Sequence, residues 1–111
     1  MKKRDEILYE MKVDVLKALA NPVRLRIAEI LLSKEMSVNQ IVEALDLERT
    51  SVSKHLSILQ KANILKSRRE GTTVHYSLLV PCIVNIFGCM EDVLKDQAKA
   101  KFAVIRDLAS N

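Results

Sequence analysis

SVSKHLSILQKANILKSRREG, residues 51–71, is the stretch that decides the fold. In its first half, apolar side chains recur three and four residues apart at Val52, Leu56 and Leu59, which is the spacing of one helical face. We therefore expect a helix over residues 49–62 with this face buried. The opposite face is left for contact with something outside the protein.

The second half of that stretch has the pattern of a β-hairpin. Ile64 and Leu65 are followed by a polar run and a glycine, and the chain then alternates between polar and apolar residues up to Leu78. Alternation of this kind is typical of a strand with one buried face. We expect two strands, with residues 70–72 near the tip of the hairpin.

Helical spacing marks the rest of the chain, and Asn21-Pro22, Ser37 and Asp46-Leu47 separate the elements. Two short helices joined by a tight turn and followed by a hairpin predict a winged helix-turn-helix. We expect a mostly α fold with five helices and a small β-hairpin, in which residues 1–111 form a single domain. The further helices expected are residues 5–20, a helix from Pro22 that ends near Ser33-Lys34, residues 38–45 and residues 80–109.

The net charge of +4 is concentrated in the centre of the chain. Residues 47–78 hold six Lys and Arg against two Glu, whereas residues 1–46 hold eight of each sign and residues 79–111 hold four of each. A basic segment between neutral flanks is typical of a surface that binds a polyanion such as DNA. The alternative is an ordinary solvated face.

The exposed half of the central helix is rich in hydroxyl groups and contains no acid. Short hydroxyls let a helix approach base edges, and neighbouring Lys side chains reach phosphates. For Ser53 and His55 the alternative role is local packing or capping, and for the two hairpin arginines it is a solubilising edge strand. The residues expected to contact DNA are Thr50, Ser51, Ser53, Lys54, His55, Ser57, Arg68 and Arg69.

Three parts of the chain share a known order and spacing: LKALANPVRLRIAEILL (residues 16–32), VSKHLSILQKANILKSRREGTTVHYSL (residues 52–78) and the terminal helix. In these parts, from about Val13 to Lys95, the chain closely resembles the ArsR/SmtB family of bacterial and archaeal repressors. The resemblance implies a homodimer whose first and last helices form the interface. It also implies a palindromic operator and release of the DNA when an effector binds. Apolar residues expected at the interface are Leu8, Val15, Ile83, Phe87, Met90 and Leu94.

The turn before the central helix departs from the family pattern. Asp46 stands where the family usually has Gly, and Asp tolerates a left-handed conformation better than most residues. Glu48 stands at the usual Ser N-cap position and is a poorer cap, so we expect the first turn to fray without DNA.

The metal sites of the family are altered as well. At one site, the start of the third helix, the matching residues are Ser37 and Asn39, so no thiolate is available there. Only two of the four matching positions at the other site could bind a metal, and Zn²⁺ needs about four N, S or O ligands. We therefore expect no zinc site of the usual family type. These four positions are Val80, Cys82, Val93 and Asp96.

Both cysteines of the chain, Cys82 and Cys89, lie seven residues apart and share one face of a helix. They are about 10 Å apart along the helix axis, which is too far for a disulfide within one chain. Across a dimer they could meet and form a thiol switch that responds to oxidation, to a persulfide bridge or to a soft metalloid. The alternative is that both are small packing residues.

Together these features predict a cytoplasmic, homodimeric transcriptional repressor that binds double-stranded DNA. No apolar run is long enough for a transmembrane helix, so no membrane partner is expected. No residues are spaced for catalysis, so we expect no enzyme. The alternative is a winged-helix module for protein–protein contact, but protein-contact faces are depleted in Lys, which argues against it.

Overall fold

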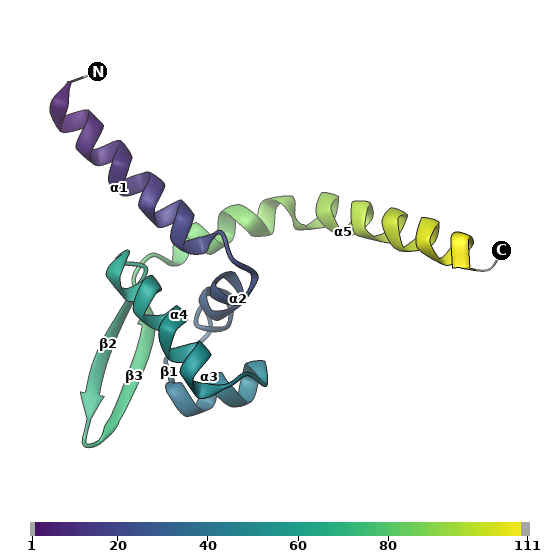
Figure 1. The fold of residues 1–111 in the computed structure, drawn as a ribbon. Helices are drawn as coiled ribbons and strands as arrows, with labels where there is room; N and C mark the ends of the chain where they lie inside the picture. Colours follow the sequence, from purple (N-terminus) through teal and green to yellow (C-terminus); the bar gives the residue numbers. More distant parts are fainter. Residues whose placement is uncertain (1, 110–111) are drawn as a thin grey trace. The chain divides into compact units, whose positions relative to one another are not determined.

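The computed structural model describes residues 2–109, apart from the side chains of Ile83, Val84 and Ile86. It contains the expected five helices and a small antiparallel sheet, which confirms the predicted fold class (Figure 1). The chain divides after Pro81 into two compact units. In chain order the elements are α1 (Lys3–Leu19), α2 (Pro22–Ile30), β1 (Met36–Ser37), α3 (Val38–Leu45), α4 (Arg49–Lys61), β2 (Leu65–Glu70), β3 (Thr73–Leu78) and α5 (Pro81–Ala109).

Polar caps start α2 and α3 where the sequence predicts. The Asn21 side chain accepts hydrogen bonds from the backbone N–H groups of Val23 and Arg24, at 2.9 and 3.1 Å. Ser37 and Gln40 form a reciprocal capping box at the start of α3. The expected end of the second helix near Ser33-Lys34 is wrong, because α2 ends at Ile30 and the chain tightens into a turn.

The apolar stripes of α2, α3 and α4 meet in one core, together with the start of β2. Val52, Leu56 and Leu59 are buried, as the helical spacing predicts, and this contact holds α4 by one face. The remaining face of α4 is consequently turned to solvent. The buried apolar residues are Ala18, Leu19, Ile27, Ala28, Leu31, Ile41, Val52, Leu56, Leu59, Ile64 and Leu65.

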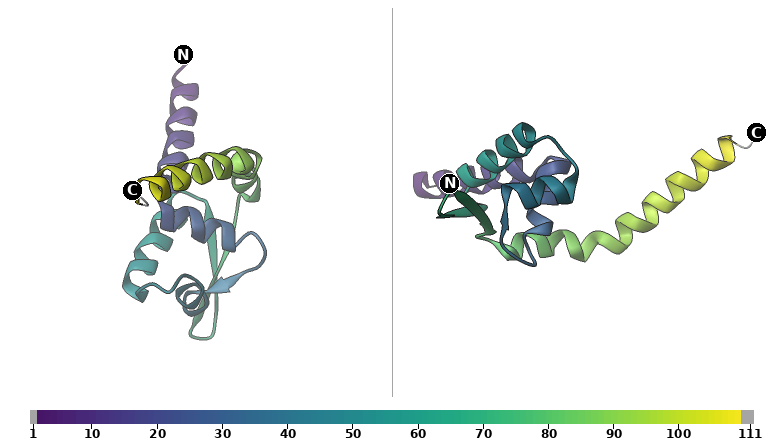
Figure 2. Two further views of the ribbon diagram at one scale, coloured as in Figure 1. Left: turned by 90° about the vertical axis from the view of Figure 1, so that its right-hand side faces the viewer. Right: turned by 90° about the horizontal axis from the view of Figure 1, so that it is seen from below.

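Strands β2 and β3 form the wing, a hairpin that extends away from the helices (Figures 1 and 2). Gly71 at its tip has φ +63°, a left-handed conformation that Gly adopts readily, so the predicted tip is confirmed. The expectation of only two strands is wrong. The backbone of Met36 and Ser37 adds a short third strand, β1, which pairs with β3, and the order is β1-β3-β2.

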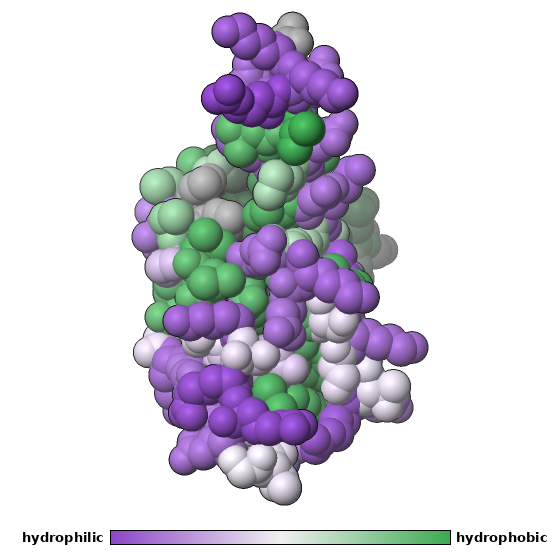
Figure 3. Space-filling model, turned by 90° about the vertical axis from the view of Figure 1, so that its left-hand side faces the viewer, coloured by the Kyte–Doolittle hydropathy of each residue, from purple (hydrophilic) through white to green (hydrophobic). Residues whose placement is uncertain are grey.

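Helix α1 carries an apolar surface over most of its length. Of its residues only Ala18 and Leu19 are buried, whereas Leu16 is 59% exposed. In Figure 3, hydrophobic atoms lie directly below the hydrophilic N-terminal end. The exposed apolar residues of α1 are Ile7, Leu8, Tyr9, Met11, Val13 and Leu16.

Helix α5, taken by itself, is 29 residues long and also exposes apolar side chains. Phe102 is the clearest case at 70% exposure. Among the helices of the described residues, none is long and apolar enough to cross a membrane. Among the α5 side chains that the structure describes, the other large apolar residues exposed are Met90, Val93, Leu94, Val104, Ile105 and Leu108.

Candidate nucleic-acid interface

The hydroxyl face of α4, made of Thr50, Ser53, Lys54 and Ser57, is exposed as the sequence predicts. Together with Arg49 these residues line an open hollow of about 460 Å³. No carboxylate lines it, and its small side chains leave room for a base edge or a phosphate to come close to the helix. Ser51 lies at the border and is half-buried.

The turn before α4 supports the start of this face. Asp46 takes the left-handed conformation, with φ 53° and ψ 50°, which confirms that Asp can serve there in place of Gly. Glu48, the N-cap residue, makes no side-chain hydrogen bond to the helix, in agreement with its expected weakness as a cap. Arg49 donates a hydrogen bond to the Asn39 side chain and so joins the first turn of α4 to α3.

His55 is turned toward α2, and it does not line the hollow. It is half-buried, and its Nδ1 accepts a hydrogen bond from Nη1 of Arg24 at 3.3 Å, because a guanidinium can only donate. Burial lowers the pKa of His55, and the nearby Arg24 cation lowers it further. Neutral His55 is therefore favoured near neutral pH, and its predicted contact with DNA depends on Nε2.

The two wing arginines differ in their surroundings. Arg68 and Arg69 are neighbours on β2, so their side chains leave opposite faces of the sheet. Arg68 is held by Glu35 and Glu70, with its Nη2 2.6 Å from Oε1 of Glu35 and its Nη1 3.1 Å from Oε2 of Glu70. Arg69 is exposed and makes no ion pair with any described residue.

This ion pairing also changes the acidity of Glu35. The hydrogen bonds from Arg68 lower the pKa of the Glu35 carboxyl, desolvation opposes them, and the positive charge of Arg68 lowers this pKa further. Glu35 is thus held in its charged form. Sequence reasoning missed Glu35, because its position before β1 becomes visible only once that strand pairs with β3.

The wing is joined to α4 by a side-chain contact as well as by the chain itself. Nε2 of Gln60 donates to Oγ of Ser67 at 2.9 Å, linking the end of α4 to β2. The backbone N–H of Ile64 donates to the carbonyl of Leu59 at 3.0 Å, within the tight turn where Asn63 has φ 60°. Hydrogen bonds therefore fix the position of the wing relative to the hydroxyl face of α4.

Cys82 and Cys89 are both free and exposed on α5. Neither thiol is buried within the chain, so a packing role for them would need the surface of another molecule. No group of three or more potential metal ligands is formed by the residues that the structure describes.

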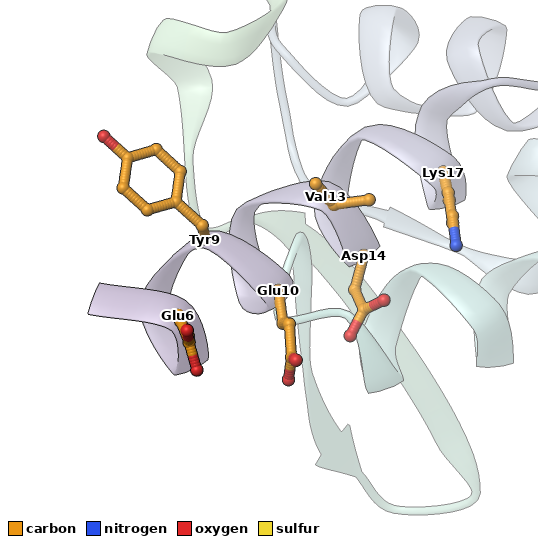
Figure 4. Close-up of a pocket in the computed structure, with 6 residues that line it drawn as sticks. All are labelled: Glu6, Tyr9, Glu10, Val13, Asp14 and Lys17. Carbon is orange, nitrogen blue, oxygen red and sulfur yellow. The ribbon is translucent and has the colours of Figure 1, made fainter. Parts of the chain in front are cut away.

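A second open hollow, of about 350 Å³, runs along α1. In Figure 4 the carboxylates of Glu6, Glu10 and Asp14 project from one side of the helix, since they are four residues apart. Such a row repels phosphates, so this hollow is unsuited to binding nucleic acid. Its other lining residues are Tyr9, Val13 and Lys17.

Comparison with known proteins agrees with this geometry. Residues 21–67 match the model of a family described as bacterial regulatory protein, arsR family. The chain is 33% identical over 104 residues to Rv0081, an HTH-type transcriptional regulator of Mycobacterium tuberculosis, and the match covers 93% of this chain and 91% of the relative.

Solved structures show the same fold. The homodimeric winged helix-turn-helix DNA-binding domain of Mb0332 from Mycobacterium bovis superposes with a TM-score of 0.75 at 28% identity, covering 90% of this chain and 93% of that one. HlyU from Vibrio cholerae superposes with a TM-score of 0.70 at 31% identity, covering 81% and 97%, respectively. HlyU is known as a transcriptional activator.

Proposed function

The chain belongs to the arsR family of bacterial regulatory proteins, which are transcriptional regulators and not enzymes, and from this we propose that it is a homodimeric repressor. The protein acts in the cytoplasm, where it binds a palindromic DNA operator. It dissociates from the operator when an effector binds. The observation that carries the proposal is the exposed, acid-free hydroxyl face of α4 beside a wing with an unpaired Arg69.

In this proposal α4 is the recognition helix. Thr50, Ser51, Ser53 and Lys54 reach bases or adjacent phosphates in a major groove, and Ser57 lies one turn further along the same side. The wing supplies contacts to the flanking backbone. His55 contributes only through Nε2, because its other ring nitrogen is bound by Arg24.

The partner in the homodimer is a second copy of the chain. Exposed apolar side chains on α1 and α5 are too many to leave in water, and burying them between two copies is favourable. The homodimeric state of the Mb0332 domain supports the same assembly for this chain. Two recognition helices related by a twofold axis would lie about 34 Å apart, one turn of DNA.

The terminal helices have a definite role in this assembly. We infer that α1 and α5 form the interface, and that residues 1–111 then act as one domain. Leu8, Met90 and Leu94 are exposed and available for this contact, while Val15 and Phe87 are half-buried. The side chain of Ile83, expected at the same interface, lies outside the described residues.

The effector acts on the two cysteines of α5. Both thiols are exposed, and their seven-residue spacing puts them on one side of the helix. Oxidation, a persulfide bridge or a soft metalloid such as trivalent arsenic would join Cys82 of one copy to Cys89 of the other. The zinc site of the usual family type plays no part in this proposal.

Two measurements test the function. The first is titration of the protein with its own upstream promoter DNA and with unrelated duplex, at several salt concentrations. A preference for the promoter and a steep salt dependence are expected, whereas a module for protein–protein contact would bind neither. The second is a reporter assay with and without the protein, because HlyU is known as an activator. Increased reporter expression with the protein would contradict repression.

A further inference from the structure

One face of the wing sheet carries a closed ion-pair cluster. In the antiparallel sheet, His75 of β3 lies opposite Ser37 of β1 on one side and opposite Arg68 of β2 on the other. Directly opposed residues share a face, so these three side chains are on the same face. Glu35 lies two residues before Ser37, and Arg68 reaches across β3 to meet it.

Each nitrogen of the Arg68 guanidinium has a carboxylate partner. Its Nε lies 2.9 and 3.0 Å from the two carboxylate oxygens of Glu35, and Nη2 lies 2.6 Å from Oε1. Its Nη1 donates to Oε2 of Glu70 at 3.1 Å, and the same oxygen lies 3.7 Å from Nε2 of His75. One guanidinium charge thus meets two carboxylates, and each of its three nitrogens already has a carboxylate partner.

Arg69 is in the opposite situation. It leaves the other face of β2, it is exposed, and it makes no ion pair among the residues that the structure describes. Two adjacent arginines, which look alike in the sequence, therefore offer different charges to a nucleic acid. Arg69 offers a full positive charge, whereas Arg68 is already neutralised by its carboxylate partners.

We propose, building on DNA binding as the proposed function, that Glu35 is a positioning residue that withholds Arg68 from the phosphate backbone. Arg69 is then the phosphate-binding arginine of the wing. Moving Arg68 to a phosphate would break its contacts with Glu35 and Glu70. It would also leave two uncompensated carboxylates beside the DNA, and like-charge repulsion opposes that arrangement.

This arrangement limits the part of DNA affinity that does not depend on sequence. Each neutralised phosphate adds to binding on every duplex alike, so a withheld arginine lowers affinity for unrelated DNA. The hydroxyl face of α4 keeps its contacts with base edges. Affinity for the operator and for unrelated DNA falls by the same factor, so the share of the binding free energy that comes from base contacts rises.

The test uses fluorescence anisotropy with a duplex of arbitrary sequence, about 30 base pairs or three helical turns long. Binding by the wild type is compared with binding by Glu35→Gln, Arg68→Gln, Arg69→Gln and Glu35→Gln/Arg68→Gln, between about 50 and 200 mM salt. Glu29→Gln is the matched control, because it removes the same charge from an exposed acid on α2 that has no ion pair with Arg68. Thermal melting by circular dichroism verifies that each variant is folded.

Glu35→Gln should bind the unrelated duplex more tightly than Glu29→Gln and steepen the salt slope by about 0.9, the value for one more phosphate contact. The ratio of its affinity to that of Glu29→Gln should fall about three- to fourfold from the lowest to the highest salt concentration. The tighter binding and the steeper salt slope should both be absent in Glu35→Gln/Arg68→Gln. Arg69→Gln should reduce the slope by about 0.9, while Arg68→Gln alone should reduce it by much less, since it removes no phosphate contact.

Two results overturn the role of Glu35 while leaving DNA binding intact. One is a Glu35→Gln slope equal to that of Glu29→Gln. The other is a loss of slope in Arg68→Gln as large as in Arg69→Gln, since that would put Arg68 on the DNA in the wild type. If the wild type binds no duplex at all, the proposed function fails and the role of Glu35 fails with it.

Discussion

Nη1 of Arg24 lies 3.3 Å from Nδ1 of His55, and this contact joins α2 to the middle of α4. Arg24 also donates from Nε to the carbonyl of Ala18, at the end of α1. One guanidinium therefore connects three helices. The stability of this junction depends on His55 remaining neutral.

The free energy of unfolding should depend on pH through His55. Its pKa in the folded protein is lowered, so the unfolded chain binds the proton more readily. The contribution of His55 to the free energy of unfolding is complete above its ordinary pKa of 6.5. This contribution is lost as the pH falls through the lowered pKa of the folded protein. Urea unfolding across this range should show the loss in the wild type and in His75→Gln. A His55→Gln variant with the same loss would contradict this origin.

Ser53→Ala should weaken discrimination by α4. Ser53 is exposed in the hollow of the hydroxyl face, where its Oγ can donate to or accept from a base edge. The difference in binding free energy between promoter and unrelated duplex should fall by about 1 kcal/mol. Ser33→Ala, another exposed serine that lies after α2, serves as the control. Equal discrimination by both variants would remove Ser53 from the interface.

Charges placed on the apolar surface of α1 or α5 should separate the dimer. Leu16 and Leu94 are 59% and 48% exposed in the single chain, so replacing either by Glu leaves its fold intact. Buried between two copies, an unpaired carboxylate is costly. Sedimentation should show dimeric wild type and monomeric Leu16→Glu and Leu94→Glu. The matched control is Leu32→Glu, 45% exposed after α2, which should remain dimeric. A stable wild-type monomer at micromolar concentration would refute the assembly.

Release from the promoter should depend on the thiols of α5. Wild type and Cys82→Ser/Cys89→Ser are compared in reduced form, oxidised form and after treatment with arsenite. The wild type should lose promoter affinity under at least one of the two treatments, and the double variant should keep its affinity throughout. Identical responses of the two proteins would leave the cysteines as packing residues in the dimer.

Spacing in the sequence was sufficient to predict most of the fold. Val52, Leu56 and Leu59 recur at helical intervals, and burial of that face alone determines which side of α4 is exposed. Local signals also placed the caps at Asn21 and Ser37, because a cap depends on residues within one turn.

The surroundings of the wing arginines could not be predicted in the same way. Strand β1 has only two residues, and its existence depends on pairing with β3 nearly forty positions later in the chain. Without β1, nothing indicates that Glu35 lies within reach of Arg68. The half-burial of His55 was hidden for a similar reason, since Arg24 comes from a helix 31 residues earlier.

The bond between Gln60 and Ser67 limits how a signal can reach the DNA. It stiffens the joint between α4 and the wing, which already share the turn at Asn63 and the core residues Ile64 and Leu65. In each copy, α4 and the wing therefore move as one unit, and an effector has little scope to shift one relative to the other. What remains adjustable in a dimer is the separation and tilt of the two DNA-binding units. Because the helical repeat of DNA is fixed, a change in that separation moves the two units out of register with successive major grooves.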